Sequence, residues 1–164
     1  MSKKFYLLIY IVAPSVLGYL HNLFYLKGIS IPIINYIYMY ALPFLMVYFW
    51  FWVGGQFAQN KIKVFPSVLV GNLVGIVSLL VYFWQFALIP DNQMNLFLAS
   101  KSQHFSSLVS IYVARIAVLF EPDKNVIGSV SFYAMQIIGL VLMIIVFTAG
   151  YFYKIKRTNS MISK

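Results

Sequence analysis

The chain has 164 residues, of which 62% are hydrophobic, 19% aromatic and only 9% charged. Soluble domains carry about 25% charged residues, so this composition excludes an ordinary soluble domain and indicates a protein embedded in a lipid bilayer. Twelve Lys and Arg residues stand against three acidic residues, which gives a net charge of +9, and there is no cysteine. The absence of cysteine excludes disulfides, thiolate metal sites and a cysteine nucleophile.

Four apolar runs without Asp, Glu, Lys or Arg are long enough to cross a bilayer, because a core of about 30 Å requires about 20 helical residues. They cover about residues 5–26, 33–57, 65–89 and 130–153. Short connectors join the first three runs, which makes sequential helices antiparallel neighbours. The sequence therefore predicts an all-α, integral membrane four-helix antiparallel bundle, with residues 1–164 forming a single transmembrane domain.

The first run follows Lys3 and Lys4 and resembles a signal peptide in its position. Its apolar length exceeds the usual range of about 7 to 15 residues and no small-residue cleavage site follows, so we expect a retained helix. Pro14 and Pro43 lie inside the first and second runs. Neighbouring helices can satisfy the carbonyl groups that proline frees, so we expect kinks rather than breaks.

The distribution of basic residues predicts the orientation, because Lys and Arg accumulate in cytoplasmic loops. With the N-terminus inside, the cytoplasmic set is Lys3, Lys4, Lys61, Lys63, Lys154, Lys156, Arg157 and Lys164. The outer set is Lys27, Lys101, Arg115 and Lys124. We therefore predict a multi-pass protein of the cell membrane with both termini cytoplasmic. The basic residues flank apolar runs instead of forming one charged surface, so we expect no nucleic-acid partner. The preference for Lys over Arg is typical of AT-rich bacterial genomes.

The segment from about 103 to 120 carries apolar residues at helical spacing, which predicts an amphipathic helix. They are Phe105, Leu108, Val109, Tyr112, Ile116, Leu119 and Phe120. If this helix crossed the bilayer, the protein would have five spans and Arg115 would lie in hydrocarbon at a cost of about 3 kcal/mol. The stretch from Phe105 also reaches only about 24 Å. We favour an interfacial or partly re-entrant helix on the outer side, and the five-span alternative remains open.

Small and polar residues of the third run fall on one helical face, which predicts close packing against another helix. They are Ser67, Gly71, Gly75, Ser78 and Tyr82, and Gln85 continues the same face. The two glycines form a GxxxG pair, a motif that lets two helix backbones approach each other. The partner is either another helix of this bundle or a second copy of the chain.

Polar side chains of the runs converge on one level near the outer ends of the helices. At about 1.5 Å per residue, most of them lie roughly 6 to 9 Å below the outer boundary. The members of this polar layer are His21, Asn22, Asn35, Tyr40, Gln85 and Gln136. Such groups either mark a pathway or binding site, or hold helices together through hydrogen bonds of about 0.6 kcal/mol each. We expect His21 to be neutral and to share a hydrogen bond with Asn22, Gln85 or Gln136.

A second, sparser polar level lies near the inner ends of the runs. It contains Gln56, Asn72 and the glycine pair Gly54 and Gly55. We interpret this level as a packed or frayed helix end.

The residues that catalysis requires are scarce. No carboxylate lies inside a run, which removes the usual proton carrier of a coupled pump. Asp91, His104, Glu121 and Asp123 match no known ligand spacing, so we expect no metal and no cofactor. We also expect no enzyme activity, since the chain has neither a phosphate-binding loop nor an assembled Ser, His and Asp set.

The remaining hypotheses concern a membrane protein without catalysis. We favour a small membrane subunit or accessory factor that acts through helix packing, surrounded by the lipid bilayer and contacting another membrane protein or itself. The alternative is a permease or channel-like bundle that binds a small, weakly polar solute at the polar layer.

Overall fold

The computed structural model describes residues 3–28, 31, 33–34, 37–60, 62–120 and 128–162, which form helices and turns with no β-strand among them. In chain order the elements are α1 (Lys3–Gly28), the π-helix η1 (Ile37–Ala41), α3 (Leu42–Gln59), α4 (Val64–Gly71), α5 (Leu73–Phe83), the π-helix η2 (Trp84–Leu88), the 3-10 turn η3 (Asp91–Gln93), α6 (Leu96–Lys101), α7 (Ser107–Ala117), the 3-10 turn η4 (Val118–Phe120) and α8 (Ser129–Ile162). The prediction of an all-α protein is confirmed.

Within the described residues, two helices have the length and hydropathy to cross a membrane. They are Tyr6–Phe24 within α1 and Val130–Met161 within α8. The pair α4 and α5 makes a third when it is taken as one span, although the two helices are bent by 50° where they meet. α3 has 18 residues, which corresponds to about 27 Å of helix. Apolar helices of membrane-spanning length are thus present, as the composition predicts.

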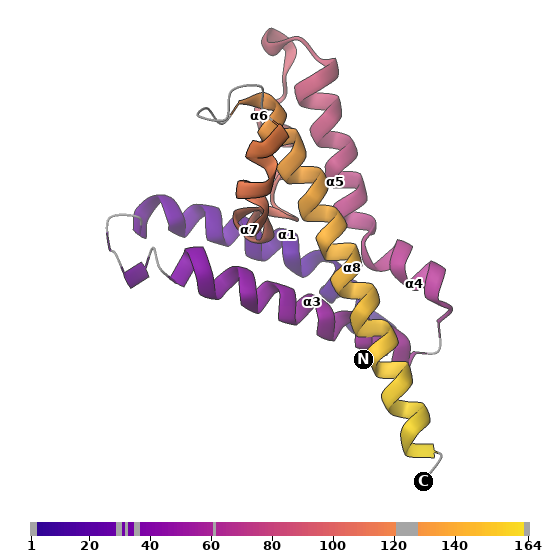
Figure 1. The fold of residues 1–164 in the computed structure, drawn as a ribbon. Coiled ribbons are helices and arrows are strands. Elements are labelled where there is room, and N and C mark those ends of the chain that lie inside the picture. Colours follow the sequence, from indigo (N-terminus) through magenta and orange to yellow (C-terminus); the bar gives the residue numbers. More distant parts are fainter. Residues whose placement is uncertain are drawn as a thin grey trace.

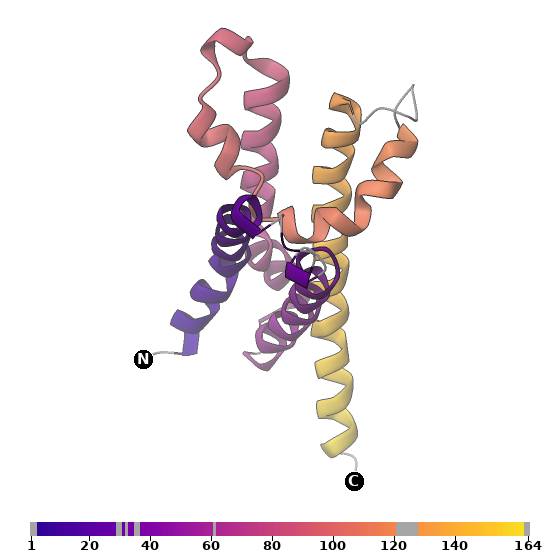
Figure 2. The ribbon, with the colours of Figure 1, turned by 90° about the vertical axis from the view of Figure 1, so that its left-hand side faces the viewer.

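The helices do not run parallel to one another. α1 and α3 lie side by side and pass across α5 and α8, which rise steeply in both views (Figure 1, Figure 2). The start of α1 and the end of α8 lie in the lower half of each view, whereas the turn between α5 and α6 lies at the top. The chain ends therefore lie away from this turn.

The crossing of α3 and α8 is the most extensive contact between helices in the described chain. A Cβ atom on Gly54 would collide with the carbonyl oxygen of Phe147, and one on Gly150 would collide with the carbonyl oxygen of Phe51. The two backbones therefore touch each other directly, which only residues without a side chain permit. Gly54, which the sequence placed at a packed or frayed helix end, lies at this central contact.

A hydrophobic core surrounds the crossing and draws on α1, α3, α7, α8 and the turn before α7. Its buried members are Leu7, Ile11, Met46, Trp50, Val53, Phe57, Phe105, Leu108, Val109, Leu140, Met143, Phe147 and Tyr151. The amphipathic helix expected at about 103–120 is present as α7 and η4. Its buried side chains Leu108, Val109, Val113 and Ala117 face the rest of the fold, where α7 packs against α3 and α8. The expectation for the apolar stripe is wrong in its second half, since Tyr112, Ile116, Leu119 and Phe120 are exposed.

The third apolar run forms two helices because the helix breaks at Asn72. Gly and Asn are both weak helix formers. The Asn72 side-chain amide donates a hydrogen bond of 2.9 Å to the carbonyl oxygen of Val68, so it competes with the backbone for a helical acceptor. By contrast, α1 continues through Pro14. Pro43 lies in the first turn of α3, where the missing N–H group of proline has no consequence.

The last helix continues beyond the expected end at residue 153 and reaches Ile162. Lys and Arg are good helix formers, so Lys154, Lys156 and Arg157 allow the helix to continue. The Thr158 hydroxyl also donates a hydrogen bond of 3.0 Å to the carbonyl oxygen of Lys154. The basic tail is thus a direct extension of α8.

Substitution of the two neighbouring glycines of α3 tests the backbone contact. Gly54→Ala should lower the free energy of unfolding by about 1–3 kcal/mol, because the new methyl group overpacks against a backbone oxygen of α8. Gly55→Ala is the matched control, since its Cβ would lie 3.7 Å from the nearest atom. That variant should be neutral or more stable by up to about 1 kcal/mol, as alanine favours helix. Unfolding in one fixed detergent measures both effects, and equal destabilisation would contradict the contact.

Candidate functional site

A cavity of about 470 Å³ lies between α1, η2, α6 and the start of α7. His21 and Asn22 line it from α1. Other residues in its wall are Phe86, Ala99, Ser100, Gln103, His104 and Ser107. The volume and the mixture of apolar surface with a few polar groups are typical of sites for small molecules. Two members of the predicted polar layer therefore lie at a cavity.

A capped helix start forms one wall of this cavity. The Asn95 side-chain oxygen accepts hydrogen bonds of 3.1 Å from the backbone N–H groups of Phe97 and Leu98, which makes Asn95 the N-cap of α6. The backbone N–H of Asn95 in turn donates a 2.8 Å hydrogen bond to Oε1 of Gln85. Gln85 is only 1% exposed. Its role in the described contacts is to fix the start of α6 against η2.

The turn between α6 and α7 rests directly on α1. A Cβ atom on Gly18 would collide with the carbonyl oxygen of His104 and lie 2.5 Å from Oγ of Ser107. The Ser107 hydroxyl donates a 3.0 Å hydrogen bond to that same carbonyl oxygen. The Ser102 hydroxyl donates one of 2.7 Å to the carbonyl oxygen of Ala99. The turn is therefore held by its own serine side chains and by contact with a glycine of α1.

His104 is the most deeply buried ionisable group at the cavity and is 5% exposed. Its Nε2 atom has no hydrogen-bond partner among the residues that the structure describes. The imidazole lies 5.5 Å from the ring of Tyr19, and Lys101 Nζ lies 3.4 Å from the centre of the same tyrosine ring. Burial lowers the pKa of His104 below 6.5, and the positive charge of Lys101 lowers it further. A neutral imidazole therefore lies close to a fixed cation.

The other members of the predicted polar layer lie elsewhere. Gln136 is 8% exposed and accepts a 2.7 Å hydrogen bond from the hydroxyl of Ser106, which joins α8 to the turn before α7. Tyr40 contributes its backbone oxygen, which accepts a 2.7 Å hydrogen bond from the hydroxyl of Tyr112. Asn35 lies outside the described residues. The layer is thus distributed over separate contacts.

The small-residue face of α4 and α5 packs inside the chain. Ser67, Gly71, Gly75 and Tyr82 are buried and Ser78 is partly buried. The ring of Phe147 covers Gly71, and side chains of Phe105 and Leu140 cover Gly75. The ring of Tyr82 lies 5.7 Å from that of Tyr133 on α8. The partners of this face in the structure are therefore α8 and the turn before α7.

A buried hydrogen bond that the sequence did not predict joins α3 to the helix break. Nε1 of Trp50 donates a 3.1 Å hydrogen bond to Oδ1 of Asn72, and both side chains are fully buried. The only sequence signal for this pair is an asparagine after a glycine within a long apolar run. Gln103, His104 and Ser107 were likewise not expected at a cavity with His21, since they lie in a segment whose position relative to α1 the sequence does not reveal.

Neither metal-ligating residues nor known relatives assign a function to this cavity. No group of three or more His, Cys, Asp or Glu side chains that could hold a metal ion occurs in the described part of the chain. Glu121 and Asp123 lie outside that part.

No protein-family model, no curated protein and no solved structure matches the chain.

Removal of the indole N–H group tests the buried hydrogen bond. Trp50→Phe should lower the free energy of unfolding by about 1–3 kcal/mol, because Oδ1 of the fully buried Asn72 loses its donor. Trp52→Phe is the control, since Trp52 is 40% exposed and contacts Tyr10 through its ring. Chemical unfolding in detergent, followed by circular dichroism, compares the two variants. A larger effect at Trp52 than at Trp50 would refute this role.

Proposed function

We propose that the chain is a multi-pass protein of the cell membrane, in which α1, α3, the α4–α5 pair and α8 each cross the bilayer, with successive spans in opposite directions and with their axes inclined to one another. Both termini are cytoplasmic and α7 lies on the outer side, with its buried residues Leu108, Val109 and Val113 against the other helices. Apolar helices of spanning length support this proposal. The excess of basic residues at the proposed inner side supports the orientation.

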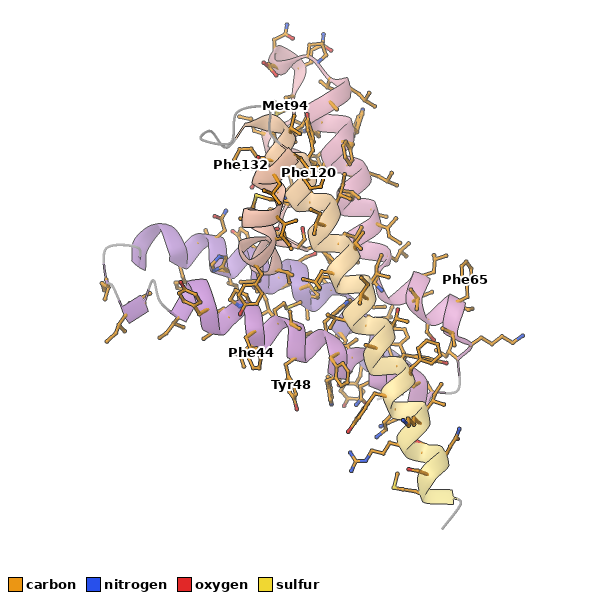
Figure 3. All side chains as sticks on the ribbon, in the orientation of Figure 1. Phe44, Tyr48, Phe65, Met94, Phe120 and Phe132 are labelled. Atoms are coloured by element: carbon orange, nitrogen blue, oxygen red, sulfur yellow. The ribbon has the colours of Figure 1, made fainter. Side chains whose placement is uncertain are left out.

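One observation carries the membrane proposal: many large apolar side chains are exposed on the outward surface of the helices. Phe44 and Tyr48 point away from α3, and Phe65 points away from α4 (Figure 3). These side chains are 64%, 64% and 76% exposed. Leu8 and Ile145 are exposed in the same way on α1 and α8. Exposure of so many large apolar side chains is unfavourable in water and matches a lipid environment.

Within the membrane, the proposed role is that of a small subunit or accessory factor that acts without catalysis, through helix packing with another membrane protein or with itself. The hydrogen bonds of Gln85 and Gln136 support this role, because each joins two elements of the fold, as in a packed bundle. The small-residue face of α4 and α5 is already covered within the chain. We therefore place the contact with a partner on the outward faces of α1 and α3.

The permease alternative is favoured by one specific observation. His21 and Asn22 share a cavity with Ser100 and Gln103, so polar groups of two segments surround one space. A permease would bind its weakly polar solute there. The two roles differ in whether the protein requires a partner for its activity.

Labelling of single cysteines tests the proposed topology, because the chain has no thiol of its own. Asn92→Cys, in the exposed turn after η2, should react with a membrane-impermeant maleimide in intact cells. Asn159→Cys, exposed near the end of α8, should react only after the membrane is permeabilised. The protein should also remain in the membrane fraction after alkaline carbonate extraction. Reaction of both cysteines in intact cells, or release by carbonate, would disprove the topology.

Photo-crosslinking tests the accessory role. A photoreactive amino acid at Phe44, which points outward from α3, should yield a discrete protein adduct in native membranes. The same amino acid at Leu80 on α5, which is also 64% exposed, should react with lipid and give no such adduct. Identical adducts from both positions indicate random collision, and lipid adducts alone from both positions argue against a protein partner.

A further inference from the structure

The segment between α5 and α8 descends into the fold and rises again. α6 lies beside α5 and α7 lies beside α8, and the turn between them, residues 102–106, lies about midway down the molecule (Figure 2). Within this turn Ser102, His104 and Ser106 are each 5% exposed, and Phe105 is 3% exposed. The surrounding helices therefore enclose the turn, which does not rest on the outer end of the fold.

Glycines of three proposed spans make room for the turn. They are Gly18 of α1, Gly75 of α5 and Gly139 of α8. A Cβ atom on Gly75 would collide with the ring of Phe105, and one on Gly139 would lie 3.1 Å from Cβ of Ser106. From the start of α8 at Ser129 to Gly139 the helix rises about 15 Å. A hydrocarbon core is about 30 Å thick, so the turn lies near the middle of the proposed membrane.

Serine hydroxyls of the segment bind acceptors within the protein. Ser102 donates a hydrogen bond of 2.7 Å to the carbonyl oxygen of Ala99, and Ser110 donates one of 2.9 Å to that of Ser106. Ser106 itself donates one of 2.7 Å to Oε1 of Gln136. Non-helical backbone at membrane depth is tolerated only where it is buried in protein or lines a water-filled cavity. The serine-rich sequence of this turn thus meets a requirement that a loop on the membrane surface does not have.

One charged side chain accompanies the turn to this depth. The ammonium group of Lys101 lies 3.4 Å from the centre of the Tyr19 ring and 5.5 Å from that of Phe97. A charge inside the membrane is costly. Contact with the faces of aromatic rings offsets part of this cost, so the position of Lys101 is compatible with a turn at mid-depth.

The cavity of about 470 Å³ lies on the outer side of this turn, against α1. Its wall extends from Met94 and Leu96, just after the outer turn η3, to Ser107 at the start of α7. Its wall residues Asn22 and Ser100 are exposed. Apolar cavities stay dry, whereas a polar space of this volume has room for on the order of ten water molecules.

We propose that residues 96–120 form a re-entrant loop, which enters the membrane from the outer side and returns to that side, and that the cavity above its turn is a water-filled vestibule. The vestibule admits water and small uncharged solutes that form hydrogen bonds. Asn22, Ser100 and Gln103 supply donors and acceptors, and no Asp, Glu, Lys or Arg of the described chain lines the space. This inference rests on the proposed membrane location.

Labelling of single cysteines with reagents of two sizes tests the proposal in intact cells. The small reagent is a trimethylammonium methanethiosulfonate, and the large one is a maleimide that carries a long polyethylene glycol chain. Asn92→Cys in the outer turn should react with both reagents. Ser100→Cys in the cavity wall should react with the small reagent alone. Leu80→Cys on the exposed face of α5 should react with neither, because a thiol in apolar surroundings stays protonated.

Two results at Ser100→Cys would overturn the proposal. Reaction with the large reagent as fast as at Asn92→Cys would place the segment on the membrane surface. Failure to react with the small reagent would show that water from the outer side does not reach the cavity.

A variant that fills the cavity tests the route to its wall. Asn22→Trp, combined with Ser100→Cys, should slow labelling by the small reagent about tenfold. Leu23→Trp is the matched control, since Leu23 is 45% exposed on the same helix and does not line the cavity. Equal rates in the two variants would show that the reagent reaches Ser100 by another route and would refute the vestibule.

Carbonate extraction separates this inference from the proposed function on which it rests. If the wild-type chain is released from membranes, the membrane proposal fails. If the chain is retained and Asn92→Cys is labelled in intact cells, but Ser100→Cys gives either of the two contrary results, only the re-entrant vestibule fails.

Discussion

The direct contact of the α3 and α8 backbones at Gly54 and Gly150 is the constraint on which the rest of the structure depends. Because no side chain separates the helices there, Trp50, one turn before Gly54, lies within the core. Its ring contacts Phe105 and Phe147 at centroid distances of 5.6 and 5.8 Å. An indole N–H group in such a site requires an acceptor.

Asn72 supplies that acceptor, and this requirement accounts for the bend between α4 and α5. A side chain that accepts from Trp50 and donates to the carbonyl oxygen of Val68 replaces regular helical geometry at that point. The bend of 50° then gives α4 and α5 different directions. The small residues of both helices can therefore follow α8 over a long distance, with Gly71 against Phe147 and Gly75 against Leu140.

The sequence predicted which segments are helical better than it predicted how the helices are arranged in space. Long charge-free runs revealed helices because hydrophobic length is a property of each segment alone. Hydropathy did not reveal the break at Asn72, since one polar residue hardly changes the mean of a long apolar run. The polar layer was located by counting depth along helices assumed to be parallel. α1 contacts α5 and α3 crosses α8 instead of running parallel to it (Figure 1), so equal depth does not bring His21 of α1 and Gln136 of α8 together.

The position of the candidate site follows from which buried polar groups form hydrogen bonds within the fold. In the half built by α3, α7 and α8, buried polar groups such as Gln136 and Asn72 bind other parts of the fold. In the half beside α1, cavities of about 470, 390 and 650 Å³ lie along the helix, and Nε2 of His104 has no partner in the described chain. A ligand adds stability where polar groups and apolar surface still lack contacts, and adds nothing where packing is complete. The cavities along α1 are therefore candidate places for this fold to accommodate another molecule.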